Sequence, residues 1–348
     1  MEISNASNVL LAKARAKYGK RLKKEDYNAL VSCSSVVDIA AYLKDKTAYG
    51  QFLSGIDVNT IHRGQLESLI IKKNYFDVDL LSQYDMTNGA EFAHYIVFKN
   101  IIRLLMAKLM SISSNLEFTS FIQEDSIDLL TWHSRLDIKK IQNAKTYSEL
   151  IQALSPSEYA QVLSEFKLEE GKDVDFFLVG TRLYKRAYEK AFIAVSHTGS
   201  TCKKELKELL GSFIDIDNFS RILRMKGTYN CSADFISDNL FSGGNLKQKA
   251  LDKIINSEDT KQATLEFNDT YIGKQVKNLS YKTPSELVDK FRFIKSRHNM
   301  FFSTNAPVVL LSYIFLSEIE ISNIYHIIEG VRYKLEKSLI EELLIYKD

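Results

Sequence analysis

Residues 318–335 read EIEISNIYHIIEGVRYKL, and the pattern of this stretch sets the expected fold. Apolar side chains recur at three- and four-residue steps, which is the spacing of one face of an amphipathic helix. The members of this stripe are Ile321, Ile324, Ile327, Ile328, Val331 and Leu335. Two polar residues, Glu320 and Asn323, lie three positions apart on a different face.

Two other stretches, FKNIIRLL at 98–105 and IDNFSRIL at 216–223, follow the same pattern. All three align on one asparagine, with apolar residues two positions before it and one, four and five positions after it. The aligned asparagines are Asn100, Asn218 and Asn323, the residues three positions later are Arg103, Arg221 and His326, and those three positions earlier are Val97, Asp215 and Glu320. Because any amphipathic helix shows much of this pattern, a repeat needs a second marker.

The second marker is a short helix with a start signal, in which a hydroxyl or carboxylate can accept from the first free amides. The three signals pair Ser35 with Asp38, Thr146 with Glu149, and Asp259 with Gln262. Each helix carries a leucine shortly before a tyrosine, and the tyrosines are Tyr49, Tyr159 and Tyr271. Tyrosine and asparagine keep their order and nearly their separation three times, which indicates three divergent copies of one helical unit.

The expected architecture is all-α, with copies at residues 1–119, 120–230 and 231–348. Each copy buries an apolar stripe and needs a neighbour to cover it. Three copies can stack in an arc or close into a ring with pseudo-threefold symmetry, and periodicity does not separate the two.

Composition supports long helices in a soluble chain. Only 3 prolines and 14 glycines occur in 348 residues, and both residue types weaken helices. The net charge of +2 gives no global reason to expect nucleic acid or a membrane. Three widely spaced cysteines without CxxC spacing are typical of reduced thiols in a cytoplasmic protein.

No motif in the chain indicates catalysis, a cofactor or a metal. The six histidines show no HExxH pairing, and neither a nucleotide-binding glycine loop nor a GxSxG elbow occurs. The favoured interpretation of Asn100, Asn218 and Asn323 is that they satisfy buried backbone or tyrosine groups within each copy. Direct contact with a partner is the alternative, in which the acid and base around each asparagine form a polar ridge facing the interior of a ring.

Two blocks, KKEDYNALVSCSSVVDIAAYLKDKTAYGQFL at 23–53 and LSEIEISNIYHIIEGVRYKL at 316–335, resemble the C subunit of V-type and archaeal-type ATP synthases. The d subunit of the eukaryotic vacuolar proton pump is a distant relative. The resemblance covers nearly the whole chain. The sequence departs from the family at Val97, where an acid is common, and at Gly330-Val331-Arg332, where glycine-lysine is common.

The resemblance implies a non-catalytic connector of the central stalk, built as a funnel of three similar helical domains. Such a funnel sits on the membrane proteolipid ring, whose members are the c or K subunits, and receives the foot of the rotor shaft made by subunits D and F. It binds no nucleotide and no cofactor, and it lies peripherally on the cytoplasmic face of the membrane. Two other hypotheses stay open: a stand-alone helical scaffold for soluble proteins, and a nucleic-acid binder that uses the basic residues between Lys13 and Lys24.

Overall fold

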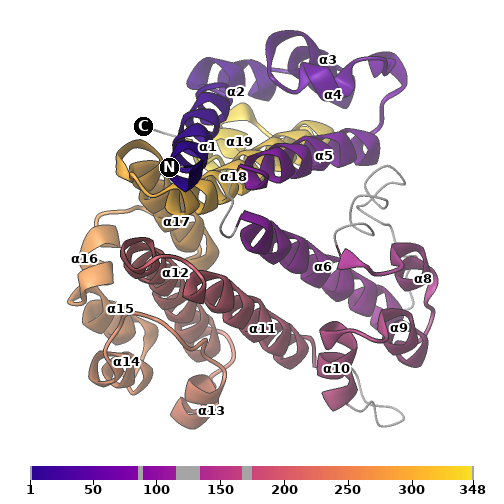
Figure 1. Ribbon diagram of the computed structural model, residues 1–348. Helices are drawn as coiled ribbons and strands as arrows, with labels where there is room; N and C mark the ends of the chain where they lie inside the picture. The colour runs from indigo at the N-terminus through magenta and orange to yellow at the C-terminus, as the bar shows by residue number, and fades with distance from the viewer. Residues whose placement is uncertain (1, 85–88, 115–133, 167–174, 347–348) are drawn as a thin grey trace. The chain divides into compact units, whose positions relative to one another are not determined.

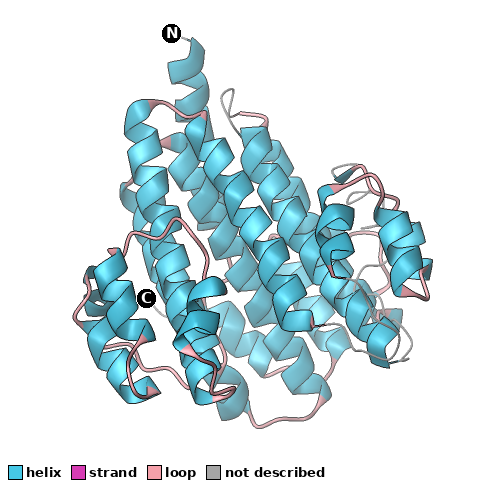
Figure 2. Cartoon of the chain, turned by 90° about the horizontal axis from the view of Figure 1, so that it is seen from below, coloured by secondary structure: helices cyan, strands magenta, loops and turns pink. Residues whose placement is uncertain are grey.

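The structure is a computed structural model that describes residues 2–84, 89–114, 134–166 and 175–346. Helices form the regular structure across these ranges, and no strand occurs within them (Figure 2). The all-α prediction is therefore confirmed. The low content of helix-breaking residues accounts for several helices of more than five turns.

The chain forms two compact units, Met1–Ala191 with Ser317–Asp348 (unit 1) and Phe192–Leu316 (unit 2). The helices of unit 1 are α1 (Glu2–Gly19), α2 (Lys24–Val31), α3 (Val36–Lys46), α4 (Gly50–Leu53), η1 (Val58–Thr60), α5 (Arg63–Ser82), α6 (Gly89–Ser114), α8 (Ile138–Asn143), α9 (Tyr147–Leu154), α10 (Glu158–Glu165), most of α11 (Phe176–Ser196), the second half of α18 (Ala306–Arg332) and α19 (Lys337–Glu342) (Figure 1). The N-terminal and C-terminal segments thus belong to the same unit.

Unit 2 contains the end of α11, the first part of α18 and everything between them. Its helices are α12 (Ser200–Gly227), α13 (Ala233–Asp238), α14 (Gln248–Ile255), α15 (Thr260–Asn268), α16 (Tyr271–Val276) and α17 (Pro284–Phe302). The division into three sequence copies at 1–119, 120–230 and 231–348 concerns similarity rather than compactness, and it stays a prediction.

The three predicted start signals are confirmed as helix N-caps. The Ser35 hydroxyl accepts from the Asp38 amide at the start of α3. Thr146 accepts from the Glu149 amide at the start of α9, and Asp259 accepts from the Gln262 amide at the start of α15. Each cap satisfies an amide that has no partner within the helix, which defines where these short helices begin.

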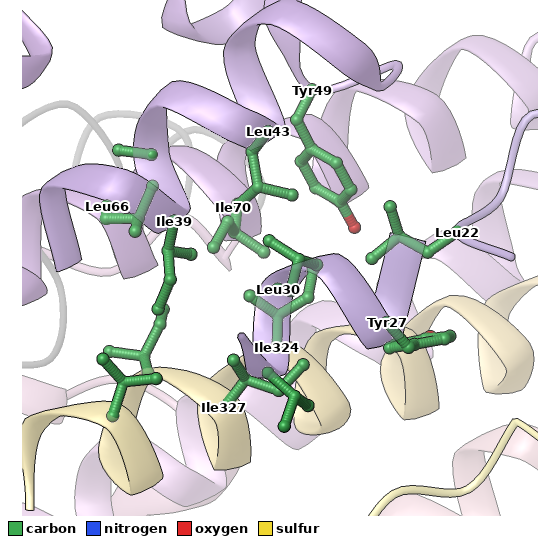
Figure 3. Close-up of a cluster of buried hydrophobic side chains, with 14 of the residues drawn as sticks. Leu22, Tyr27, Leu30, Ile39, Leu43, Tyr49, Leu66, Ile70, Ile324 and Ile327 are labelled. Atoms are coloured by element: carbon green, nitrogen blue, oxygen red, sulfur yellow. The ribbon is translucent and has the colours of Figure 1, made fainter. Parts of the chain in front are cut away.

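The stripe of residues 318–335 packs against the N-terminal helices. Ile324, Ile327 and Ile328 on α18 are fully buried in one cluster with residues of α2, α3 and α5 (Figure 3). The N-terminal members of that cluster include Leu22, Tyr27, Leu30, Ile39, Leu43, Tyr49, Leu66 and Ile70. The apolar face predicted for the C-terminal stretch therefore covers the start of the chain.

Helix α18 ends at a tight turn that brings α19 back over it. Lys334 adopts φ 55°, and the Leu335 amide donates to the Gly330 carbonyl at 2.9 Å, which is the pattern of a left-handed helix C-cap. A Cβ on Gly330 would lie 2.5 Å from the side chain of Ile340 on α19. Glycine is therefore required here by the close approach of α19.

One helix within the described residues, α18, is long and apolar enough to cross a membrane. Buried residues make up 67% of its most apolar window, as expected for the core helix of a protein interior. The finding is therefore weak support for a membrane span.

We expect Ile327→Ala to lower the free energy of unfolding by about 2–4 kcal/mol, because it removes a fully buried side chain and leaves a cavity. Chemical denaturation followed by circular dichroism measures the loss. Leu339→Ala is the matched control: Leu339 on α19 is exposed, so its loss should stay within about 0.5 kcal/mol. Equal losses for the two variants would contradict the packing described for α18.

Candidate functional site: the asparagine helices

Asn218 on α12 binds the backbone of one residue in the connection that follows α13. Its side-chain nitrogen donates to the Phe241 carbonyl at 2.8 Å, and its oxygen accepts from the Phe241 amide at 2.8 Å. The side chain is 3% exposed. The amide group thus forms a two-bond clamp on a segment that is not helical.

Asn323 on α18 makes the same clamp on the segment after α19. Its side-chain nitrogen donates to the Ile345 carbonyl at 2.9 Å, and its oxygen accepts from the Ile345 amide at 2.9 Å. The nitrogen also lies 3.2 Å from the hydroxyl of Tyr27 on α2. With 2% of its surface exposed, Asn323 is buried like Asn218. Both asparagines thus satisfy buried backbone groups, but only Asn323 does so within its own predicted copy, since Phe241 lies beyond residue 230 in the third copy.

Asn100 on α6 differs from the other two. It is half-buried, and its oxygen accepts from Arg103 Nη1 at 3.3 Å. The residue three positions earlier is the buried Val97 instead of an acid. The part of the chain that follows α6, residues 115–133, lies outside the described residues.

The acids three positions before the other two asparagines also bind backbone. Asp215 accepts from the amides of Asn245 (2.9 Å) and Leu246 (3.1 Å). Glu320 accepts from the Leu22 amide at 2.8 Å and from the Tyr49 hydroxyl at 2.8 Å.

The amides of Leu246 and Leu22, which these acids bind, are equivalent. Leu246 directly precedes Lys247, the N-cap residue of α14, and Leu22 directly precedes Lys23, the N-cap residue of α2. Each acid therefore fixes the entry into the next set of short helices. For Glu320 that set lies at the opposite end of the chain.

The residues three positions after the asparagines do not share one role. The Arg221 side chain donates from Nε to the Asn239 carbonyl at 3.1 Å and lies over the ring of Phe241 at 4.6 Å. It therefore reinforces the Asn218 clamp. Arg103 is exposed, and His326 is half-buried.

The three tyrosines separate into two buried anchors and one exposed residue. Tyr49 binds Glu320 of α18, and Tyr159 stacks on Phe98 of α6 with ring centroids 4.6 Å apart. Tyr159 thus contacts the asparagine helix of the preceding copy, whereas Tyr49 of the first copy contacts the asparagine helix of the last. Tyr271 is 66% exposed, whereas its neighbour Ile272 is buried. A Cβ on Gly50, directly after Tyr49, would meet the Lys44 carbonyl, and a Cβ on Gly273, directly after Ile272, would meet the Phe267 carbonyl. These equivalent close approaches place Ile272 at the position of Tyr49.

Asp215 and Glu320, the acids on the two helices that carry clamping asparagines, have raised pKa values. Burial raises the pKa of Asp215 to about 6, although the amides of Leu246 and Asn245 act in the opposite direction. Burial also raises the pKa of Glu320, against the effects of Lys73, the Leu22 amide and the Tyr49 hydroxyl. Both carboxylates are occupied by backbone contacts in the interior, so the raised pKa values follow from a structural role and need no catalytic one.

Among the aligned residues, Arg103 is the charged one that stays accessible. Desolvation by the surrounding protein lowers the pKa of Arg103, but Glu318 and the nearby tyrosines Tyr184, Tyr75 and Tyr325 raise it more. Glu318 is itself bound by Lys99, with Nζ 2.9 Å from Oε2. The group therefore combines two cations with one carboxylate, and the guanidinium is permanently charged.

Sequence reasoning missed the partners of these residues because most of them are backbone atoms. Phe241, Ile345, Leu246 and Leu22 contribute amides or carbonyls, which any residue type supplies. The detectable signal was the repeated leucine-lysine pair before α2 and α14, at Leu22-Lys23 and Leu246-Lys247. Across the described residues, no group of three or more His, Cys, Asp or Glu side chains is arranged to hold a metal ion.

Comparison with known proteins places the chain in a family. The family model described as ATP synthase (C/AC39) subunit matches residues 10–343, so the chain belongs to the ATP synthase (C/AC39) subunit family. The C subunit of the A-type ATP synthase of Pyrococcus abyssi is 24% identical over 358 residues, covering 95% of this chain and 89% of the relative. That of Methanocaldococcus jannaschii is 24% identical over 367 residues, covering 96% and 85%.

Some matches cover less. The C subunit of the A-type ATP synthase of Pyrococcus horikoshii is 26% identical over 214 residues, which span 60% of this chain and 57% of that relative. The resemblance that residues 23–53 and 316–335 indicate is confirmed by the family match.

We expect Asn218→Ala and Asn323→Ala each to lower the free energy of unfolding by about 1–3 kcal/mol, because each leaves a backbone amide and carbonyl unpaired in the interior. Urea denaturation measures the loss. Asn100→Ala is the control, since Asn100 is half-buried and clamps no backbone in the described residues; its loss should be smaller. An Asn218→Ala protein as stable as the wild type would refute the clamp.

The raised pKa of Asp215 predicts a stability term that depends on pH. The folded-state pKa of about 6 exceeds the ordinary value of 3.8, so the folded protein binds the proton more tightly. The stabilisation is complete below the unfolded pKa and is lost as pH rises through about 6. Relative to Asp215→Asn, which cannot titrate there, the wild type should gain about 1 kcal/mol between pH 7 and pH 5. Parallel pH profiles for the two proteins would contradict this.

Proposed function

We propose that the chain is a non-catalytic rotor subunit of a V-type rotary ATPase or ATP synthase. In this role it couples the D–F shaft to the membrane proteolipid ring during proton or sodium transport, from the cytoplasmic face of the membrane. The observation that carries the proposal is the family match across residues 10–343, together with relatives named as the C subunit of A-type ATP synthases.

The asparagine helices support a connector rather than an enzyme. Their polar residues Asn218, Asn323, Asp215 and Glu320 are used for backbone contacts that hold the fold together. A connector that transmits torque needs a firmly held scaffold and a surface with many exchangeable contacts. We further propose that the three copies close into a funnel that receives the foot of the shaft.

Within this proposal, the Arg103 group is the best candidate for a shaft contact. The helix α6 carries the asparagine that does not clamp backbone in the described residues, and its arginine is exposed beside tyrosines. Arginine and tyrosine are among the residue types most enriched at energetically important positions of protein interfaces. The net positive charge of Lys99, Arg103 and Glu318 suits an acidic side chain on the partner.

Affinity purification of the tagged chain from detergent-solubilised membranes of its native host tests the proposal. Mass spectrometry should identify subunits D and F and the proteolipid with it. A stable partner unrelated to a membrane ATPase would instead favour a stand-alone scaffold. ATP hydrolysis by the isolated, purified chain would contradict the non-catalytic role.

We expect Arg103→Glu to weaken binding of purified D–F by at least about tenfold, because it reverses a charge facing an acidic partner. Isothermal titration calorimetry measures the affinity, and a thermal melt checks that the fold is retained. Arg186→Glu on α11 is the matched control, since Arg186 forms an exposed pair with Glu189. Equal affinities for the wild type and Arg103→Glu would exclude Arg103 as a shaft contact while leaving the subunit assignment intact.

A further inference from the structure

Unit 2 contains an apolar groove between the end of α12, the first half of α15 and the start of α17. Its volume is about 520 Å³, and its lining residues are Leu223, Thr260, Lys261, Thr264, Leu265 and Pro284. Leu265 is 67% exposed at its edge. A leucine this exposed to solvent, at the edge of an apolar groove, marks a surface that an apolar group of a partner can cover.

Unit 1 builds the same place from equivalent helices. The N-cap Ser35 of α3 corresponds to the N-cap Asp259 of α15, and the N-cap His62 of α5 corresponds to the N-cap Thr283 of α17. Helices α18 and α12 correspond through their clamping asparagines, so that Ile328 and Leu223 both lie five residues after one. The groove of unit 2 therefore has a counterpart lined by α3, α5 and α18.

The counterpart in unit 1 is covered by the chain itself. The connection between α4 and α5, residues 54–62, packs Ile56 and Val58 against the buried cluster that contains Ile328 and Ile39. Ile61, two residues before α5, is 4% exposed and belongs to that cluster. The Lys44 ammonium donates to the Ile56 carbonyl at 3.0 Å and holds the segment on α3.

Unit 2 lacks the residue that completes this cover. Its connection between α16 and α17, residues 277–283, is shorter and places the half-buried Leu279 at the position of Val58. The residue two before α17 is Lys282, which is exposed, where unit 1 has the buried Ile61. Unit 2 therefore has no buried aliphatic residue at the position where unit 1 has Ile61, a member of the cluster that contains Ile328 and Ile39.

The charges around the groove are predominantly positive. Lys261 lines the groove, Arg224 follows the lining residue Leu223 and donates to Ser285 beside Pro284, and the exposed Lys282 lies two residues before Pro284. Of the nearby acids, Glu286 is paired with Lys290 at 2.6 Å, and Asp259 accepts from the Gln262 amide as an N-cap. The segment that covers the counterpart in unit 1 carries an acid, Asp57, between Ile56 and Val58.

We propose that this groove is a docking site for a short non-helical segment of another protein, in which a branched aliphatic residue lies close to an acidic one. The aliphatic residue occupies the place that Ile61 fills in unit 1, and the acid faces the basic border. Recognition by a few apolar anchors in a groove, with charge complementarity at the rim, is a common mode of binding peptide segments.

The chain supplies its own probe for the test. A fluorescent peptide of residues 54–63, SGIDVNTIHR, is titrated with the full-length protein and followed by fluorescence anisotropy. Saturable binding is expected. Leu265→Glu should weaken it by at least about tenfold, since it removes the apolar contact of one leucine and adds a charge that repels the acid of the peptide. Lys261→Glu should also weaken it.

Matched controls make the result decisive. Leu339→Glu alters an exposed leucine of unit 1 and should leave peptide binding unchanged, and thermal melts confirm that the Leu265→Glu protein is folded. On the peptide, replacement of Ile61 by serine or of Asp57 by lysine should each reduce binding. No detectable binding at concentrations up to about 1 mM overturns the proposal, because a contact with a weaker Kd contributes little binding free energy. Binding that Leu265→Glu leaves intact, as expected if the peptide displaced its own copy in unit 1, overturns it as well.

Discussion

A primary amide buried away from water needs partners for its NH2 group and for its carbonyl oxygen, and the backbone of a single non-helical residue offers both. Asn218 and Asn323 each use this match, with Phe241 and Ile345 as the bound residues. The clamp sets the position of a non-helical segment along the asparagine helix. A shift by one residue would leave two backbone groups and one side chain unpaired in the interior.

The acid one turn before each asparagine extends the same constraint. Asp215 and Glu320 hold the residues that precede the N-caps of α14 and α2. One turn of α12 therefore holds the connection between α13 and α14 at two points, whereas one turn of α18 holds both the segment after α19 and the segment before α2. The short helices that flank these contacts, α13, α14, α19 and α2, have six to eight residues, too few to be stable alone in water. Their positions come from the long helix that holds their ends, together with the apolar stripe that they cover.

Local features of the fold could be predicted from the sequence because their signals are local. Helix content, the caps at Ser35, Thr146 and Asp259, and the apolar face of α18 depend on residue types at fixed spacing. The structural use of Asn218 and Asn323 could be inferred, but their partners could not, since a backbone amide leaves no mark in the sequence. At Tyr271 the sequence alignment is off by one residue. The buried counterpart of Tyr49 is Ile272, because an isoleucine can fill the same apolar position as a tyrosine. The groove of unit 2 likewise could not be predicted from composition, because it depends on one position, where unit 2 has the exposed Lys282 and unit 1 has the buried Ile61.

The contact between Glu320 and the Leu22 amide joins groups 298 positions apart along the chain. During synthesis helices α2 and α3 emerge long before α18, so Leu30, Ile39 and Leu43 at first lack the α18 side chains of their cluster. The helix that covers them, α18, leaves the ribosome only after the chain between them has been made. Contacts at such long range must wait for the intervening chain, so this part of the fold is slow to complete and its apolar surface stays open to other chains in the meantime. Helices α2 and α3 therefore complete their folding together with α18, and successful production depends on protection of their apolar surface until α18 has been synthesised.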